Sequence, residues 1–295
     1  MLNRPTLIVS LALLLYAVSA SADSLAYVVN GNNQFGTIDL ATGAFHQIGS
    51  NTPEGESGLA EAQNGSLLTL TFSGKLDSIN PATGVTSVVG PTGLADCSTP
   101  TSPCGPTSAN TLGQIGGTIY ATDFANNLYR VNPLTGAATK IGATGIPGIP
   151  FIPLSTNPDG SFNAYDESLF SRAGKLYATF DTITVNPVTF VPTAVISPDL
   201  YQIDLLTGHA TVVAPTTLTF GAALDVNGTI YAFEDATSQA VTLDLTNGNT
   251  SVVSNFDSAA GIIDGASPVV PEPASMALAV LGIALVGVCR LRRRD

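Results

Sequence analysis

Acidic side chains are the most frequent titratable groups in this sequence, and some of them are close neighbours. The pairs are Glu54 with Glu56, Asp166 with Glu167, and Glu234 with Asp235. Two carboxylates held at a fixed separation across a cleft can hydrolyse a glycosidic bond. Because the chain has 22 acidic residues among 295, such pairs also arise by chance, and they do not by themselves predict an enzyme.

One acidic segment, Asn157–Ser168, also contains aromatic side chains. It reads NPDGSFNAYDES and includes Asp159, Phe162, Tyr165, Asp166 and Glu167. An aromatic ring beside carboxylates could bind a sugar or a calcium ion. We expect a solvated loop here, and its acids are the candidate catalytic groups if the protein is instead a secreted enzyme that acts on glycans.

A further set of polar residues recurs at matching places along the chain. Its members are Asp39, Asn80, Asn132, Asp204 and Asp244. A ring of carboxylates could hold calcium or a cationic ligand, whereas Asp or Asn at the start of a tight turn accepts hydrogen bonds from backbone N–H groups. Because Asn in place of Asp would weaken a charged ligand set, the pattern favours the turn role.

Histidine and cysteine offer no clear catalytic or metal-binding set. His46 and His209 occupy different positions relative to their turns, so strand alternation predicts no shared site for them. Cys97 and Cys104 lie in CSTPTSPC without further zinc ligands nearby. In an exported chain we expect them to form a disulfide that closes a small loop. We therefore expect no catalytic residue, no metal site and no cofactor.

The elements that would position these residues come from a repeat. Each copy has a strand with alternating apolar residues, an Asp or Asn, a Gly-containing turn and a second β-branched strand, a pattern that predicts a β-hairpin. The copies are Gly36–Gly49, Leu76–Gly90, Leu128–Gly142, Leu200–Ala214 and Ala240–Ser254. The turn glycines, at 43, 84, 136, 208 and 248, give a basic period of about 40 residues with insertions. With further short strands before the hairpins, this period predicts the blades of a β-propeller.

The ends of the repeat region predict how the propeller closes. The first copy lacks a leading strand, while Ser258–Gly265 resembles a leading strand without a blade of its own. Pairing the two would close the ring and hide both sheet edges. We therefore expect an all-β, propeller-like domain at residues 23–266, with five blades of short antiparallel strands. We expect the insertions Gly145–Asp166 and Thr182–Pro198 to be loops on one rim or to hide a further hairpin.

The repeat region, from about Leu25 to Asp264, resembles the broad family of propeller-like repeat proteins whose hairpins carry a Thr-Gly turn. This resemblance implies a fold and no particular activity. A β-sandwich is the alternative architecture, because irregular spacing between repeats can imitate the strand spacing of a sandwich.

Charge and the N-terminal segment indicate where the protein acts. Between Asp23 and Pro271 the chain has five basic and twenty acidic residues, a net charge of about −15. Such a surface repels phosphate groups, so we expect no nucleic-acid partner. Residues 1–22 have the layout of a signal peptide, with Arg4, an apolar run and the small residues Ala20 and Ala22. We expect cleavage after Ala22 and export of the rest.

The C-terminal segment has three parts in order. Residues 267–273 are a Pro-rich linker with extended backbone. Residues 274–289 carry no charge and would form a transmembrane helix of about 24 Å, short of a hydrocarbon core of about 30 Å. Residues 290–295 are a basic tail, expected in the cytoplasm, with Arg290, Arg292, Arg293 and Arg294.

This tail resembles the PEP-CTERM sorting signal. The positions that carry the resemblance are Val270, Pro271, Glu272, Pro273, Ala274 and Ser275, followed by the apolar stretch and the arginines. The resemblance implies recognition by an exosortase, a membrane protease-transpeptidase of Gram-negative bacteria, and cleavage near the signature. It also implies an inner-membrane-anchored precursor, a final place at the cell surface or outside the cell, and an association with exopolysaccharide and biofilm matrix. A permanent single-span anchor is the alternative.

Together these features predict an exported, non-catalytic structural or binding module. The expected partners are the sorting enzyme, exopolysaccharide, and the membrane through the C-terminal helix before processing. The alternatives are a secreted enzyme that acts on glycans and a calcium-dependent adhesin on the same scaffold.

Overall fold

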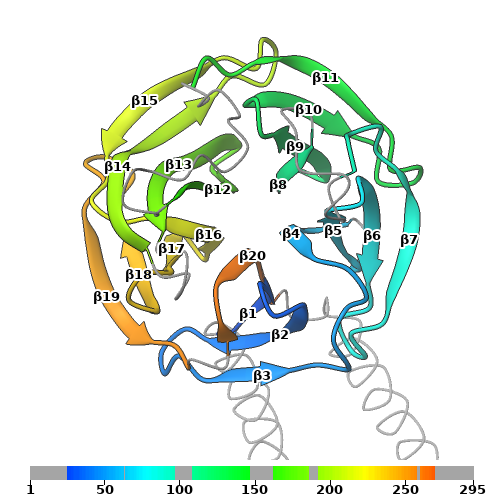
Figure 1. The fold of residues 1–295 in the computed structure, drawn as a ribbon, viewed down its shortest axis with the longest axis horizontal. Helices are drawn as coiled ribbons and strands as arrows, with labels where there is room; N and C mark the ends of the chain where they lie inside the picture. The colour runs from blue at the N-terminus through cyan, green and yellow to red at the C-terminus, as the bar shows by residue number, and fades with distance from the viewer. Residues whose placement is uncertain are drawn as a thin grey trace, which may run out of the picture. The chain divides into compact units, whose positions relative to one another are not determined.

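The computed structural model describes residues 25–62, 64–96, 108–146, 162–185, 192–257 and 260–269. The regular elements of these residues are twenty β-strands, which form five antiparallel sheets of four strands each. The sheets are arranged around a common centre as five blades (Figure 1). The predicted all-β propeller with five blades is therefore confirmed.

Each blade is described here from its innermost strand outwards. Blade 1 consists of β20 (Ile263–Pro268), β1 (Leu25–Asn30), β2 (Gln34–Asp39) and β3 (Phe45–Gln47). Blade 2 consists of β4 (Glu56–Glu61), β5 (Leu67–Thr71), β6 (Lys75–Ile79) and β7 (Thr86–Pro91). Blade 3 consists of β8 (Ala109–Ile115), β9 (Thr118–Asp123), β10 (Asn127–Val131) and β11 (Ala138–Ala143).

The remaining two blades follow the same order. Blade 4 consists of β12 (Phe162–Arg172), β13 (Lys175–Val185), β14 (Pro192–Ile203) and β15 (Ala210–Pro215). Blade 5 consists of β16 (Phe220–Val226), β17 (Thr229–Glu234), β18 (Gln239–Leu243) and β19 (Thr250–Asn255). In every blade the two outer strands are the hairpin that the sequence repeat predicts.

Blade 1 closes the ring by joining strands from the two ends of the repeat region. β20 pairs antiparallel with β1, with Ala26 opposite Pro268 and Asn30 opposite Ile263. The predicted closure is confirmed, but the closing strand is Ile263–Pro268 and not Ser258–Gly265. Ser267 and Pro268, expected in the linker, are thus part of the sheet. The pairing also means that the chain enters and leaves blade 1 at the same end of the propeller.

Apolar side chains fill the space between neighbouring blades, and the described residues form five such clusters. The cluster between blades 5 and 1 includes Phe233, and the cluster between blades 1 and 2 includes Phe35; both side chains are fully buried. Burying a side chain of this size contributes about 1.5–3 kcal/mol relative to leaving it exposed. Because each blade lends side chains to two interfaces, stability depends on the closed ring.

The Thr-Gly turns also join neighbouring blades. In blade 3, Gly136 has φ of 78°, and a Cβ placed there would lie 2.4 Å from the Gly90 carbonyl oxygen of blade 2. The Ala138 N–H, just after this turn, donates to the Thr92 carbonyl oxygen across the same interface at 3.0 Å. Only glycine allows both this backbone conformation and this approach. The repeated Thr-Gly therefore serves contact between blades as well as the turn.

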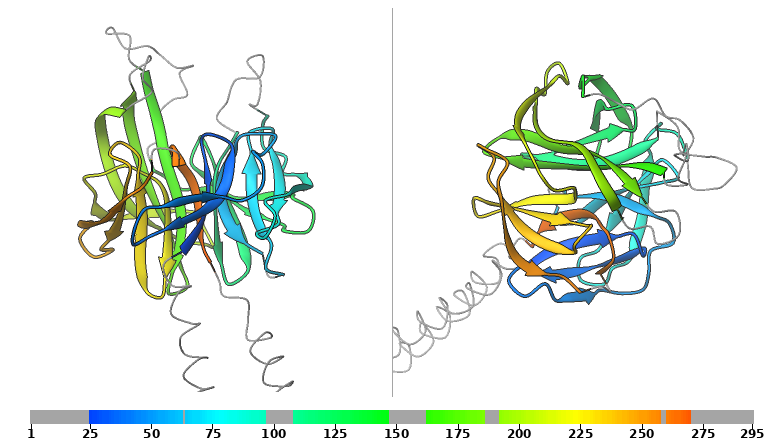
Figure 2. Two further views of the ribbon diagram at one scale, coloured as in Figure 1. Left: turned by 90° about the horizontal axis from the view of Figure 1, so that it is seen from below. Right: turned by 60° about the vertical axis from the view of Figure 1, so that its left-hand side comes forward.

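Blade 4 departs from the regular repeat. Its three inner strands have 11, 11 and 12 residues, whereas the matching strands of the other blades have five to seven. Figure 2 shows these strands extending past the other blades at one end of the propeller. Of the two expected alternatives, loops are therefore wrong for residues 162–166, 182–185 and 192–198, while the paired segments 182–185 and 192–196 lengthen the β13–β14 pair into the kind of hairpin that the other alternative named. The β-branched run Thr182–Val185 pairs with the start of β14, and such residues favour extended strands.

Candidate functional site

The acids and amides at the repeat turns are occupied by backbone donors. The Asp39 Oδ1 atom accepts N–H groups from Ala41 and Thr42 at 2.8 and 3.0 Å. The corresponding Asp204 oxygen accepts from Leu206 and Thr207, and these bonds lower the pKa of the Asp204 carboxyl. Asn80, Asn132 and Asp244 make equivalent bonds. The predicted role as turn acceptors is confirmed, and the five residues form no cation-binding ring.

A second set of turn acceptors was not found from the sequence. These residues end the second strand of four blades and are Asn30, Thr71, Asp123 and Glu234. Asp123, for example, accepts the Asn127 N–H at 2.8 Å and the Tyr129 hydroxyl at 2.8 Å. In the sequence, the sign of these turn acceptors is a polar residue at the end of the second strand. It was missed because the type of this residue changes from blade to blade. These four residues, among them the acids Asp123 and Glu234, therefore have structural roles.

We expected a solvated loop at the acidic segment Asn157–Ser168. The part of this segment that the structure describes is not such a loop. Residues 162–168 belong to β12, with Glu167 opposite Phe180 on β13. The Glu167 side chain is 6% exposed, and the Asn110 amide donates to its Oε2 atom. Burial raises the pKa of the Glu167 carboxyl to about 8. Glu167 is therefore a buried group between blades 3 and 4, unsuited to binding a polysaccharide from solvent.

The histidines and cysteines bring no additional site. His46 lies exposed on blade 1 and His209 lies exposed at the turn of blade 4, so they share no site, as predicted. Cys97 and Cys104 fall outside the described residues, and their disulfide stays a prediction. In the part of the chain that is described, no three His, Cys, Asp or Glu side chains gather closely enough to hold a metal ion.

Among the described residues, the innermost strands enclose two small cavities of about 100 and 10 Å³, lined by residues such as Leu59, Leu169 and Ala266. Ligand pockets usually have about 300–1,000 Å³. The inner strands approach closely because they carry glycines: a Cβ on Gly58 would lie 2.2 Å from the Leu112 nitrogen. Neither of these two cavities is thus large enough for a ligand.

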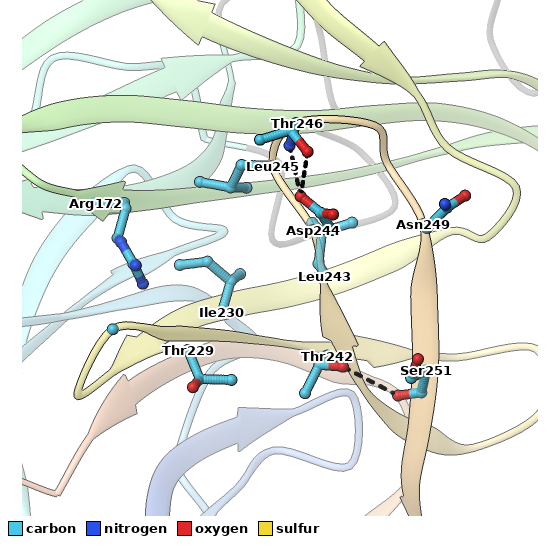
Figure 3. A pocket seen from close by; sticks show the side chains of 11 residues that line it. Arg172, Thr229, Ile230, Thr242, Leu243, Asp244, Leu245, Thr246, Asn249 and Ser251 are labelled. Carbon is cyan, nitrogen blue, oxygen red and sulfur yellow. Dashed lines mark hydrogen bonds between the residues drawn. The ribbon is translucent and has the colours of Figure 1, made fainter.

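A larger groove of about 480 Å³ lies on blade 5 (Figure 3). Its lining residues are Arg172, Gly228, Thr229, Ile230, Thr242, Leu243, Asp244, Leu245, Thr246, Asn249 and Ser251. Ile230 and Leu243 are buried and provide an apolar floor, while hydroxyl and amide groups line the walls. We refer to it as the blade 5 groove. No sequence pattern predicted this groove, because its residues come from three strands of blade 5 and from a neighbouring blade.

The charges at this groove are largely paired. Arg172, which comes from β12 of blade 4, lies 3.4 Å from the Asp225 carboxylate, and both are partly exposed. The Asp244 Oδ1 atom accepts the Thr246 N–H at 2.8 Å and its hydroxyl at 2.7 Å. The side chains of Thr229 and Asn249 make no hydrogen bond within the described ranges, so they are available to a ligand.

The C-terminal segment lies beyond the described residues, apart from residues 267–269, and so do the signal peptide and the predicted helix at 274–289. Where the structure is described, no helix is long and apolar enough to cross a membrane. The family model for the PEP-CTERM protein-sorting motif matches residues 269–294. The match includes Val270–Ser275 and the four terminal arginines. Such a motif implies export, and processing by an exosortase at the membrane.

Comparison with curated proteins found no match. Among solved structures, a nidogen/laminin complex is 11% identical over 82% of this chain and 96% of that chain, with a TM-score of 0.47. A virginiamycin B lyase from Staphylococcus aureus is 12% identical over 77% of this chain and 68% of that chain, with a TM-score of 0.40. A protein of unknown function from Bacteroides caccae is 13% identical over 82% of this chain and 97% of that chain, with a TM-score of 0.42. Likeness at this level indicates no ligand or activity.

Fold and tail together identify the kind of protein. The body consists of five four-stranded blades closed by β20 and β1. The segment that follows β20 is the one that the sorting-motif model matches. The chain is a five-bladed β-propeller that carries a C-terminal PEP-CTERM sorting motif.

Proposed function

We propose that this protein is an exported, non-catalytic binding module that its tail delivers to the cell surface or extracellular matrix, where it binds exopolysaccharide. The observation that carries the proposal is the sorting-motif match at residues 269–294, directly after the strand that closes the propeller. Because the tail follows a closed domain, its removal would leave all five blades intact.

The assigned roles of the acids support a non-catalytic body. Glycoside hydrolysis needs two carboxylates facing a bond in an open cleft. Among the acids singled out in the sequence, Asp39, Asp204 and Asp244 hold turns, Glu234 caps a strand, and Glu167 is buried. These roles are structural, which favours a module that binds over one that cleaves.

The blade 5 groove supports a polysaccharide as the ligand. Hydroxyl and amide groups above an apolar floor suit a sugar, which offers hydroxyls along its edges and C–H groups on its faces. A neutral polymer fits better than a polyanion, because Arg172 is paired with Asp225 and Asp244 lies nearby. The net negative charge of the body repels polyanions as well.

The sorting part of the proposal is tested by fractionating cells that produce the wild type or the variant Glu272→Ala. We expect the wild type to be processed and found at the surface or in the medium. Glu272→Ala is expected to stay in the membrane at the precursor size, because the central acid of the signature is lost. The control is Asp295→Ala, which removes a carboxylate from the same tail outside the matched segment. Equal processing of all three would contradict the proposal.

The binding part is tested by affinity electrophoresis in gels that contain neutral exopolysaccharide from the producing cells. Ser251→Arg places a long side chain across the groove. It is expected to raise the Kd for the polysaccharide, measured from the retardation, at least about tenfold, a loss of about 1.4 kcal/mol in binding free energy. Ser87→Arg is the matched control, because Ser87 occupies the same exposed position on the outer strand of blade 2. If both variants bind as the wild type does, the groove is not the binding site.

A further inference from the structure

Two buried carboxyl groups lie on the same face of blade 2. Glu56 on β4 is opposite Thr71 on β5, and Asp77 on β6 is opposite Thr69 on β5. Because side chains two residues apart share a face of a strand, all four lie on the face that carries Leu67 and Ile79. Those two residues pack against Val29 and Phe35 of blade 1. The two acids therefore face the interface between blades 1 and 2.

These acids lack hydrogen-bond donors. Glu56 is 3% exposed and Asp77 is 6% exposed. Glu56 Oε2 and Asp77 Oδ1 are buried, and neither accepts a hydrogen bond from any described residue. An ionised oxygen in such a place costs several kcal/mol unless a proton or a cation compensates it.

The nearest protein cation is already engaged. The Lys75 ammonium lies 3.1 Å from the Glu54 carboxylate at the partly exposed edge of this cluster. Burial, and then the Asp77 charge, raise the pKa of Glu56 to about 8, and burial and Glu54 raise the pKa of Asp77. Lys75 thus interacts with Glu54 and Asp77. No cation among the described residues shifts the pKa of Glu56, which leaves the three acids short of positive charge.

Besides the two carboxyl groups, the hydroxyl of Thr69 on the same face is an oxygen of the kind that hard cations prefer. The Thr69 hydroxyl donates its proton to the Gly58 carbonyl at 2.9 Å, so its oxygen lone pairs stay available. Carboxylate, hydroxyl and carbonyl oxygens are the usual ligands of calcium, and the flexible coordination of calcium suits an irregular interface better than the strict octahedron of magnesium. An exported protein with a strongly negative surface also attracts divalent cations.

We propose that Glu56 and Asp77 bind a calcium ion between blades 1 and 2, with the Thr69 hydroxyl beside it. Two carboxylates make a site of modest affinity, comparable with extracellular calcium modules whose Kd is about 0.1–1 mM. Calcium would join the first two blades where the apolar cluster is smallest. This proposal does not depend on the sorting role or on sugar binding.

The test is the thermal unfolding of the exported protein in EDTA, in about 10 mM calcium and in about 10 mM magnesium. At this excess over Kd, calcium is expected to raise the Tm by about 3–10 °C, and magnesium by less. Titration calorimetry is expected to show one calcium per chain. An unchanged Tm and no calcium binding would overturn the proposal whatever the variants do.

Variants locate the ion. Glu56→Gln and Asp77→Asn are expected to weaken calcium binding at least about tenfold and to remove most of the Tm shift. Glu56→Asp keeps the charge and is expected to bind calcium more weakly than the wild type. This variant replaces Glu56→Gln in the test if Glu56→Gln does not fold. Glu167→Gln is the matched control, since Glu167 is another buried carboxyl with an unpartnered oxygen, and it is expected to keep the full calcium response.

The alternative is a proton shared by the two acids. In that case calcium leaves the Tm unchanged and Glu56→Gln stabilises the protein in EDTA, a result that overturns the proposal. A calcium response that persists in both Glu56→Gln and Asp77→Asn, or that disappears in Glu167→Gln, also contradicts it.

Discussion

The acids of this propeller fall into two groups that differ in position and in environment. Asp39, Asp204 and Asp244 occur at the same place in their repeats, and backbone N–H groups bind each of them. Glu56 and Glu167 lie at matching places on the innermost strands of blades 2 and 4 only, opposite Thr71 and Phe180. Both are buried, and each has one oxygen without a hydrogen-bond partner among the described residues. The repeated acids are therefore part of what builds a blade, whereas the two buried acids need a proton or a cation.

The two buried acids also differ from each other. Glu167 has a donor in the Asn110 amide, and burial is the main cause of its raised pKa. Glu56 has a second buried acid, Asp77, as its neighbour. A proton is enough to neutralise Glu167, while the pair on blade 2 suits a divalent cation. Burial of an acid is thus not enough to make it a candidate cation-binding site.

The largest expected effect is a loss of stability at high pH that comes from Glu167. Its pKa rises from 4.5 to about 8 on folding, so between these values the folded state keeps a proton that the unfolded state has released. Stability is fully present below the unfolded value and falls as the pH rises towards 8, by up to about 5 kcal/mol from this group. Urea unfolding in EDTA at pH 5, 6.5 and 8 measures it.

Glu167→Gln sharpens this prediction. In the variant, the free energy of unfolding is expected to lose the part of its pH dependence that comes from about one proton. The variant is also expected to be more stable than the wild type at pH 8. Asp204→Asn is the control, because the pKa of Asp204 is lowered and this acid does not titrate in that range. An unchanged slope in Glu167→Gln would show that Glu167 is ionised in the folded protein.

A smaller effect is expected at the repeated acids. Asp39→Ala removes an acceptor of two backbone N–H groups and is expected to cost about 1 kcal/mol in the free energy of unfolding. Asp39→Asn is expected to cost less than about 0.5 kcal/mol, because Asn80 and Asn132 accept the equivalent backbone hydrogen bonds in blades 2 and 3. Urea unfolding compares the two. Equal losses would mean that the charge of Asp39, and not its acceptor oxygen, matters.

The repeated features could be predicted from the sequence because each was present several times. The hairpins, the turn acceptors, the number of blades and the closure by both ends follow from one pattern of strand, Asp or Asn, and Thr-Gly. The exact closing strand did not follow, because Ser267 is small, Pro268 lacks a backbone donor, and both were interpreted as the start of the linker. Only their pairing with β1 gives them a strand conformation.

Features that do not recur in every blade were missed for the same reason. The extension of blade 4 contains Pro192 and Pro198 and occurs once, so it was interpreted as an insertion of loops or of a further hairpin. The burial of Glu56 and Glu167 depends on which side of an inner strand faces the next blade, and only two of the five blades have an acid at this place. The blade 5 groove combines blade 5 with Arg172 of blade 4, a contact that no local pattern contains.

The most direct test of the central claim is the intact mass of the protein recovered from the surface or the medium of cells that contain an exosortase. We predict a chain that has lost residues 1–22 and the segment after the signature Val270–Ser275, while the body through Pro268 is complete. A recovered chain that still ends at Asp295 would contradict the claim that the tail is a sorting signal, and would indicate a permanent anchor.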